Sequence, residues 1–279
     1  MQLTVEERQK LKEIQMKLFK NFIAVCEKLQ LRYFVVGGTA LGAVRHGGYI
    51  PWDDDIDVGL MREDYDVFLR EGQKYLKDGY FLQTFDTDGF PMNFAKIRDE
   101  NTAFVETTVS NLKGVSHGVY IDVFPLDYFP VEKVSEFKTL KKKYHSCLVA
   151  AVGYRGLPFK TRLRLLVGRM LLFFQPSLNS VGKIIRKRDE LYRSVPKTDK
   201  IVNNCGAWGD REIVSANVYG EGVRMPFEEL TVTVPERYDE YLTCLYGDYM
   251  TPPPVEKREP HHYCSCFSAE KSYKDCTWK

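Results

Sequence analysis

The sequence has no hydrophobic run long enough to cross a membrane as a helix. Its longest apolar stretch, LLVGRMLLFF at residues 165–174, contains Arg169, whereas a spanning helix needs about 20 apolar residues. The N-terminal stretch TVEERQKLKE is too charged for the apolar region of a secretory signal peptide. Internal repeats and low-complexity linkers are also absent from the sequence. We therefore expect a cytoplasmic protein, whose closest approach to lipid is peripheral contact at the inner face of the membrane.

Paired cysteines are lacking as well. The seven cysteines are an odd number, mostly scattered, and form no CxxC pair, so the sequence lacks the disulfide framework of a small secreted domain. The C-terminal set His261, His262, Cys264, Cys266 and Cys276 suggests a zinc site, but the CxC spacing and the missing second ligand cluster disfavour one. We expect ordinary thiols.

The chain as a whole has almost no excess of charge, but one region is strongly basic. The 279 residues include 40 basic and 38 acidic side chains, a formal net charge of +2. Residues 131–200 alone carry 17 basic and 5 acidic residues. A basic region favours an acidic partner such as phosphate, an anionic membrane surface or nucleic acid. No helix-turn-helix, RRM or KH signature accompanies it, and we expect no nucleic-acid partner.

The pattern of residues 1–130 interleaves helices and strands. Apolar residues recur every three or four positions over residues 4–30, which predicts an amphipathic helix with a capping box formed by Thr4 and Glu7. Strands are predicted at 33–36 and 56–61 and within the stretches GYFLQTF, NFAKIRD and VYIDVF. This order predicts an α+β fold with a mixed β-sheet core flanked by helices.

From residue 131 the pattern changes to long basic helices, followed by a tail rich in glycine and proline. Helices are predicted at 132–152, 160–175, 180–194 and 236–246. The segment 160–175 reads either as an interfacial helix on an anionic membrane or as a core helix whose arginines reach solvent. We expect three regions: a catalytic core at 1–130, a basic helical region at 131–200 and a C-terminal region at 201–279.

The most informative stretch is FVVGGTALGAVRHGGYIPWDDDIDVGL. Asp55 and Asp57 flank Ile56 in a predicted strand, so the period of two places both carboxylates on one side. Carboxylates held ~6–7 Å apart on one strand repel each other unless a cation lies between them, and Mg²⁺ is a natural occupant. Upstream, Gly37 and Gly38 end a strand and lead into a short helix.

That glycine turn suits phosphate binding, because free backbone N–H groups at the helix start near Thr39 can approach an anion without a Cβ in the way. A third carboxylate, Asp122, lies mid-strand among apolar residues in VYIDVFPLD. Burial there is costly unless the carboxylate is paired or bound to a metal. Asp127 is expected in a turn after Pro125. A glycine turn followed by a D-h-D strand predicts a nucleotidyltransferase-like arrangement.

The acidic run also matches two other patterns. The run DDDID is also compatible with a solvated acidic loop. Asp53, Asp55 and Asp57 match positions 1, 3 and 5 of a calcium-binding EF-hand loop, with Asp64 at position 12. An EF-hand requires glycine at position 6, where this chain has Val58, and a helix before the loop, where it has GGYIPW. Both interpretations are therefore disfavoured.

Together these stretches, with FAKIRDENT, GVYIDVFPLD and YGDYMTPPPVEKREPHH, resemble the LicD family of phosphotransferases, whose distant relatives are the fukutin-type proteins. The resemblance covers most of the chain and is weakest over 131–200. It implies a nucleotidyltransferase-like fold and the transfer of phosphocholine, or a similar phospho-alcohol, from a CDP-activated donor such as CDP-choline. The acceptor it implies is a hydroxyl of a cell-surface glycan (lipopolysaccharide, teichoic acid or capsule), which can be lipid-linked.

By the same resemblance, Asp55 and Asp57 match the family's metal-binding pair for Mg²⁺ or Mn²⁺, and Asp53 matches an acidic neighbour. It also places the C-terminal loop over the active site. Further candidates for phosphate binding are basic residues between and after the acidic motifs: Arg45, His46, Lys96, Arg98, Lys257, Arg258 and His261. His46 could instead cap a turn, and Lys96 and Arg98 could lie on a surface strand.

The resulting hypothesis gives each group a role. Asp55 and Asp57 bind the metal, and Asp122 completes the metal shell or takes the proton of the attacking hydroxyl. Gly37, Gly38 and Thr39 cradle phosphate. The alternatives are a nucleotidyltransferase that uses an NTP on a small sugar or antibiotic, and a non-catalytic phosphate- or metal-binding protein.

Overall fold

The core of the fold is a mixed sheet whose central strands follow the order β1-β2-β6-β4-β3. The computed structural model describes residues 2–152, 181–258, 260 and 262–278. The central strands are β1 (Tyr33–Val35), β2 (Asp57–Met61), β3 (Tyr80–Gln83), β4 (Ala95–Asp99) and β6 (Val119–Tyr128). Two short strands, β7 (Lys200–Val202) and β8 (Ile213–Ser215), extend the sheet from the far end of β6. The predicted α+β fold is confirmed.

The register of the sheet brings distant residues together at its centre. Strands β2 and β6 run parallel, and Asp57 lies opposite Asp122. Strand β4 runs antiparallel to β6 on its other side, where Lys96 lies opposite Asp122. Side chains at facing positions of neighbouring strands lie on the same face of a sheet. Two acidic residues and one basic residue therefore share the middle of one face.

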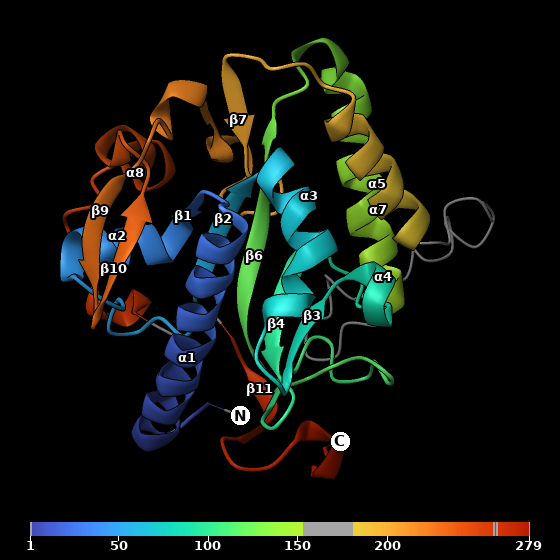
Figure 1. Cartoon of the computed structure of the whole chain (residues 1–279), viewed down its shortest axis with the longest axis vertical. Helices are drawn as coiled ribbons and strands as arrows, with labels where there is room; N and C mark the ends of the chain where they lie inside the picture. The colour runs from blue at the N-terminus through green and yellow to red at the C-terminus, as the bar shows by residue number, and fades with distance from the viewer. Residues whose placement is uncertain (1, 153–180, 259, 261, 279) are drawn as a thin grey trace.

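The opposite face is covered by α1 (Val5–Leu29) and α3 (Arg62–Glu71), which lie in front of the sheet in Figure 1. The predicted capping box is present at the start of α1, where the Thr4 hydroxyl accepts from the Glu7 N–H at 3.2 Å and the Glu7 carboxylate accepts from the Thr4 N–H at 2.8 Å. Phe22 of α1 packs edge-on against Tyr33 and Phe68, at centroid distances of 5.4 Å for both. The apolar stripe of α1 thus forms the main core with the sheet.

Beside β1 lies α2 (Gly37–His46), packed against a hairpin of β9 (Val223–Phe227) and β10 (Leu230–Val234) and against α8 (Tyr238–Tyr246). A second pair of strands, β5 (Ala103–Glu106) and β11 (Cys264–Ser268), lies over part of the sheet face that carries Asp122. Phe104 of β5 packs edge-on against Tyr120 of β6 at 5.8 Å. Two segments that lie far apart in the sequence therefore cover one face of the sheet.

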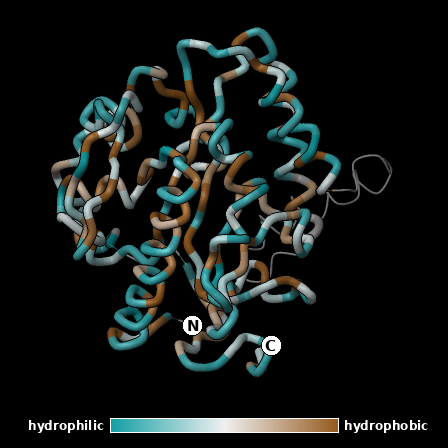
Figure 2. Tube along the Cα trace, in the orientation of Figure 1, coloured by the Kyte–Doolittle hydropathy of each residue, from teal (hydrophilic) through white to brown (hydrophobic). Residues whose placement is uncertain are grey.

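Two long helices, α5 (Val134–Val152) and α7 (Val181–Arg193), pack against each other beside the sheet (Figure 1). Figure 2 shows that β6 is largely hydrophobic, whereas the visible turns of α5 and α7 are mainly hydrophilic. The predicted helix at 160–175 lies outside the described residues. No helix within the described ranges is long and apolar enough to cross a membrane.

The remaining elements are short. They are α4 (Phe85–Asp88) and the 3-10 turns η1 (Gly72–Tyr75), η2 (Val131–Lys133), η4 (Gly209–Glu212), η5 (Ala216–Val218), η6 (Val255–Lys257) and η7 (Tyr273–Asp275).

The prediction that Asp127 lies in a turn is wrong. Strand β6 continues through Pro125 as far as Tyr128, and the Asp127 side chain is 1% exposed. Its carboxylate accepts two hydrogen bonds from Arg62 of α3, from Nε at 2.6 Å and from Nη2 at 2.9 Å. A buried carboxylate needs such a bidentate partner, because desolvation of an unpaired charge is costly. Asp127 therefore joins α3 to the sheet and is not part of the acidic cluster at its centre.

Candidate active site

Four aspartates lie together where β2 begins, next to the N-terminus of α2. Asp57 is the first residue of β2, and Asp53 and Asp55 lie in the segment before it. The strand is therefore shorter than predicted, and Asp55 precedes it. Asp53 and Asp122 are 7% and 6% exposed. We call Asp53, Asp55, Asp57 and Asp122 the carboxylate cluster.

The electrostatics of the carboxylate cluster favour a bound cation. Burial raises the pKa of Asp57 well above its usual range, and the nearby charges of Asp55, Asp122 and Asp53 raise it further. Burial and the charges of Asp55 and Asp54 likewise raise the pKa of Asp53, and Asp55 also shares a hydrogen bond with it. Mutual repulsion of this kind is relieved when a divalent cation binds between the carboxylates. Their oxygens form the hard donor set that Mg²⁺ and Mn²⁺ prefer.

The first two glycines of α2 allow the helix to approach this cluster. The helix begins at Gly37, two residues earlier than the predicted start at Thr39. A Cβ at Gly38 would lie 2.7 Å from Asp53 Oδ2, closer than a side chain tolerates. Gly37 has φ +55°, and a Cβ there would lie 3.3 Å from Asp57 Oδ2. A larger residue at Gly38 would displace the Asp53 carboxylate or the start of the helix.

Hydrogen bonds fix the start of α2 against β2 and α8. The Thr39 hydroxyl accepts from the backbone N–H of Asp57 at 2.8 Å, and the Gly37 N–H donates to the Tyr241 hydroxyl at 3.0 Å. The N–H of Gly37 is therefore engaged and does not face a ligand in this structure. The N-terminal end of a helix dipole still favours negative charge at this position.

Lys96 forms a buried ion pair with the carboxylate cluster. Its Nζ lies 2.8 Å from Asp122 Oδ1 and 3.9 Å from Glu106 Oε2, and it sits over the Tyr120 ring at 3.3 Å from the centroid. Burial raises the pKa of Asp122, and the charge of Lys96 opposes that rise. Lys96 is 3% exposed. It therefore supplies fixed positive charge at one side of the cluster.

Arg98 does not reach the carboxylate cluster. Its side chain is fully buried, its Nη1 donates to the Gly118 carbonyl at 2.7 Å, and its Nε donates to the Gln83 side chain. Its Nη2 lies 3.5 Å from Glu106 Oε2. Although burial raises it, the charges of Lys96 and Arg98 bring the pKa of Glu106 down to about 2. The expectation that Arg98 contacts phosphate is therefore not retained, because its guanidinium is buried and contacts Gln83, Gly118 and Glu106.

Asp54 and Glu106 were not singled out from the sequence, and His262 was named only within the disfavoured zinc set. His262 Nδ1 lies 3.0 Å from Asp54 Oδ1 and 3.7 Å from Asp55 Oδ2, and the His262 N–H donates to Asp54 Oδ2 at 3.1 Å. Asp54, Asp55 and His262 offer ligand atoms within 4.8 Å of one another, close enough to hold a metal ion. The pair HisHis after the three prolines was the only signal in the sequence.

His262 binds the C-terminal segment to the acidic segment. Burial lowers its pKa, but the hydrogen bond to Asp54 and the charges of Asp55, Glu106 and Asp54 outweigh this and raise it to about 10. An imidazolium at neutral pH thus neutralises part of the acidic charge. It contributes stability that is fully present below the unfolded pKa of ~6.5 and is lost as the pH rises through about 10.

We therefore expect His262→Ala to have a lower free energy of unfolding than wild type at pH 7 in EDTA, by about 1–3 kcal/mol. The variant should accordingly unfold at a lower urea concentration. The difference between the two proteins should shrink as the pH is raised toward 10, because wild type then loses the charged pair. Urea denaturation at several pH values measures it. A difference that stays constant to pH 10.5 would show that the ion pair contributes nothing.

The other basic candidates gather at the end of α2. Arg45 Nη1 donates to the Tyr249 carbonyl, and the Arg258 guanidinium lies 5.1 Å from the centroid of the Trp52 ring. His46 packs edge-on against the same indole at 6.4 Å. Trp52 immediately precedes Asp53, so these residues lie beside the acidic segment. The side chain of Lys257 and the whole of His261 lie outside the described residues.

A mixed sheet with clustered carboxylates beside a glycine-rich helix start can hold a divalent cation next to a phosphate group. Residues 30–149 match the family model described as "LicD/FKTN/FKRP, nucleotidyltransferase domain". This match confirms the resemblance to the LicD family over residues 30–149.

The match with one curated protein extends over nearly the whole chain. "Lipopolysaccharide cholinephosphotransferase LicD" from Haemophilus influenzae is 27% identical over 272 residues, which are 93% of this chain and 96% of that protein. "Ribitol 5-phosphate transferase FKRP" from Homo sapiens is 50% identical over 42 residues, 15% of this chain and 8% of that protein. An uncharacterised protein of Rickettsia typhi, RT0683, is 39% identical over 67 residues, 24% of this chain and 22% of that protein.

Proposed function

We propose that this chain is a LicD-type phosphotransferase that moves phosphocholine, or a similar phospho-alcohol, from a CDP-activated donor to a hydroxyl of a cell-surface glycan. The observation that carries the proposal is the facing pair Asp57 and Asp122 on adjacent parallel strands, joined by Asp53 and Asp55 in the segment before β2. The full-length similarity to a lipopolysaccharide cholinephosphotransferase supports the choice of donor and acceptor.

In this reaction the phospho-alcohol passes directly from donor to acceptor, and the protein forms no covalent bond with it. The glycan hydroxyl attacks the phosphorus that carries the alcohol, the new P–O bond forms, and the bond from that phosphorus to the bridging oxygen of CMP breaks. Catalysis of such a transfer is positioning and charge stabilisation. The hydroxyl proton must also leave, and Asp122, whose pKa is raised by burial, would accept it or ligate the metal.

Asp55 and Asp57 would hold Mg²⁺ or Mn²⁺, with Asp53 as a neighbouring carboxylate. When bound, the cation neutralises the donor diphosphate and the charge that develops on departing CMP. Lys96, paired with Asp122, adds positive charge on the other side. Gly38 and Thr39 at the start of α2, with Arg45, His46 and Arg258 near its end, would contact donor phosphates.

The three regions expected from the sequence enter the proposal as well. Residues 1–130 would supply the catalytic core and residues 201–279 would complete the site, because His262 contacts Asp54 and Arg258 lies against Trp52. The basic helical region 131–200 would meet an acidic substrate or an anionic membrane surface at the cytoplasmic face.

The test measures which nucleotide product appears. The protein is incubated with a panel of CDP-alcohols, with and without lipopolysaccharide, teichoic acid or capsule glycan, in Mg²⁺ or in EDTA. We expect CMP to be released in Mg²⁺, faster with the acceptor present, and none in EDTA. In parallel, NTPs are supplied with small sugars and aminoglycosides. Pyrophosphate release there, with no CMP from any CDP-alcohol, would replace the proposal with the nucleotidyltransferase alternative.

A further inference from the structure

A cavity of about 670 Å³ lies between α5, α7 and the segment that precedes β4. Its wall is part apolar, with Met92, Phe94 and Leu148, and part basic, with Lys141, Lys142 and Arg188. No carboxylate belongs to the wall within the described part of the chain. Its volume is in the range of sites that bind small organic molecules.

Arg188 is the most unusual group of this wall. It is 2% exposed, and its Nη1 has no hydrogen-bond partner among the described residues. Its Nε and Nη2 face the side chain of Asn204, whose amide oxygen accepts from both when the amide is turned toward the guanidinium. The guanidinium also lies 4.4 Å from the centroid of the Tyr144 ring. A buried donor without a partner is costly, and a ligand anion removes that cost.

One wall residue of the cavity, Phe94, lies close to Lys96, the ion-pair partner of Asp122. The Phe94 ring stacks at a tilt on Phe124 with centroids 4.7 Å apart, and Lys96 Nζ lies 5.4 Å from the Phe94 centroid. Lys96 in turn pairs with Asp122 at 2.8 Å. Phe94 therefore links the wall of the cavity to Lys96 and, through Lys96, to the carboxylate cluster.

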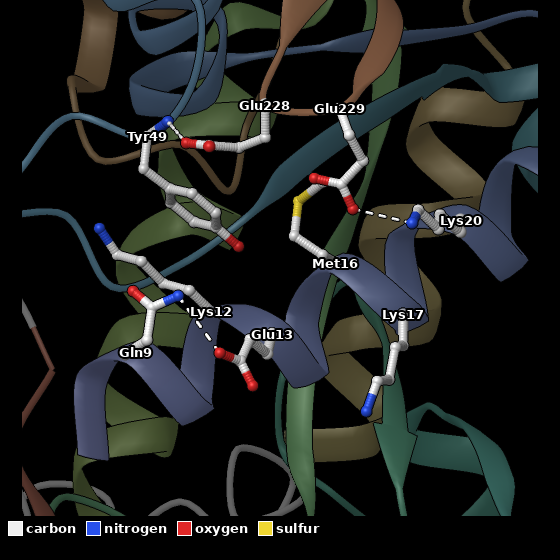
Figure 3. A pocket seen from close by; sticks show the side chains of 9 residues that line it. All are labelled: Gln9, Lys12, Glu13, Met16, Lys17, Lys20, Tyr49, Glu228 and Glu229. Atoms are coloured by element: carbon white, nitrogen blue, oxygen red, sulfur yellow. Dashed lines mark hydrogen bonds and ion pairs between the residues drawn. The ribbon is translucent and has the colours of Figure 1, made fainter. Parts of the chain in front are cut away.

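A second cavity provides a contrast. It has about 390 Å³ and lies between α1 and the β9–β10 turn (Figure 3). Three lysines and three glutamates line it, Lys20 pairs with Glu229 at 2.8 Å, and Glu228 accepts from the Tyr49 N–H at 2.9 Å. Basic and acidic residues are balanced there, which favours an anion less than the basic wall of the first cavity does.

We infer that the cavity between α5 and α7 binds an organic phosphate, with the phosphate at Arg188, Lys141 and Lys142 and the organic part against Phe94 and Met92. Under the proposed function, on which only the choice of ligand rests, this phosphate has two sources: the nucleotide of the donor or a phosphorylated sugar of the acceptor. Binding at this cavity needs no divalent cation, because its own side chains supply the positive charge.

Calorimetric titration in EDTA tests the inference with CMP, glucose 6-phosphate and inorganic phosphate as probes. We expect one of the two organic phosphates to bind at least tenfold more tightly than inorganic phosphate, and its identity tells donor from acceptor. Lys142→Ala should weaken that binding about fivefold, whereas Lys143→Ala, a neighbouring exposed lysine outside the wall, should leave it unchanged. Arg188→Met should weaken it more than Lys142→Ala does.

The inference is overturned if neither organic phosphate binds more tightly than inorganic phosphate, or if the two lysine variants bind alike. Because Arg188 is buried, the Met variant counts only if its urea midpoint is that of a folded protein, and otherwise Lys142 decides. The titration involves no turnover. If the protein binds CMP in EDTA but releases no CMP from CDP-alcohols, the proposed function is refuted and the inferred site is retained. If it releases CMP from CDP-alcohols but binds neither organic phosphate more tightly than inorganic phosphate in EDTA, the inferred site is refuted and the proposed function is retained.

Discussion

Replacing Asp57 by asparagine is expected to reduce CMP release by at least about a thousandfold. Asp57 lies opposite Asp122 and beside Gly37 at the start of α2, so its carboxylate is a central member of the carboxylate cluster. An amide is a weak ligand for Mg²⁺ compared with a carboxylate. Removing one of several mutually repelling charges should leave the metal-free protein as stable as wild type, or more so. Initial rates over a range of Mg²⁺ concentrations, with urea denaturation in EDTA, measure both effects.

A matched control is Asp78→Asn, because Asp78 is an exposed aspartate in the turn before β3. It removes the same charge from the surface and should retain the rate of wild type. If Asp57→Asn retained the wild-type rate and Mg²⁺ dependence, the carboxylate cluster would have no part in the chemistry.

Asp122→Asn is expected to reduce the rate by about 10²–10⁴-fold, and pH and Mg²⁺ titrations separate its two roles. As a metal ligand, the variant should need more Mg²⁺, and added Mg²⁺ should restore part of the rate. As a general base, it should bind Mg²⁺ as wild type does and lose the acidic limb of the pH–rate profile.

A third role for Asp122 is structural, since Lys96 Nζ lies 2.8 Å from its carboxylate. In that case Asp122→Asn would lower the melting temperature but leave the Mg²⁺ affinity and the pH profile of the remaining activity unchanged. Lys96→Met is the informative companion variant. It removes the same ion pair while keeping the carboxylate, so a variant that still requires the usual Mg²⁺ concentration separates pairing from metal binding.

The local structure of the catalytic region was predictable from the sequence. The amphipathic period of α1, its capping box and the strands around Asp57 and Asp122 are short-range patterns, and the structure contains all of them. The alternation of Lys96 and Arg98 also correctly indicated that both side chains lie on one face. The period of a strand specifies the face of each residue but not the neighbour that covers it.

The neighbours of these strands were not predictable, and they decide what each residue does. The β5 strand covers Arg98 with Glu106, and β6 extends far enough for Arg62 to reach Asp127. The contact between His262 and Asp54 joins residues 208 positions apart in the sequence. Pairings over such separations depend on how the sheet and the C-terminal segment pack, which a single sequence does not show.

The central claim is most directly tested by ³¹P NMR of CDP-choline incubated with the protein, Mg²⁺ and a lipopolysaccharide acceptor. The account predicts that the two diphosphate signals disappear together while a CMP monoester signal and a glycan phosphodiester signal grow in equal amounts. Persistence of the diphosphate signals with folded, Mg²⁺-binding protein, for CDP-choline and for every other CDP-alcohol tried with each acceptor glycan, would contradict it.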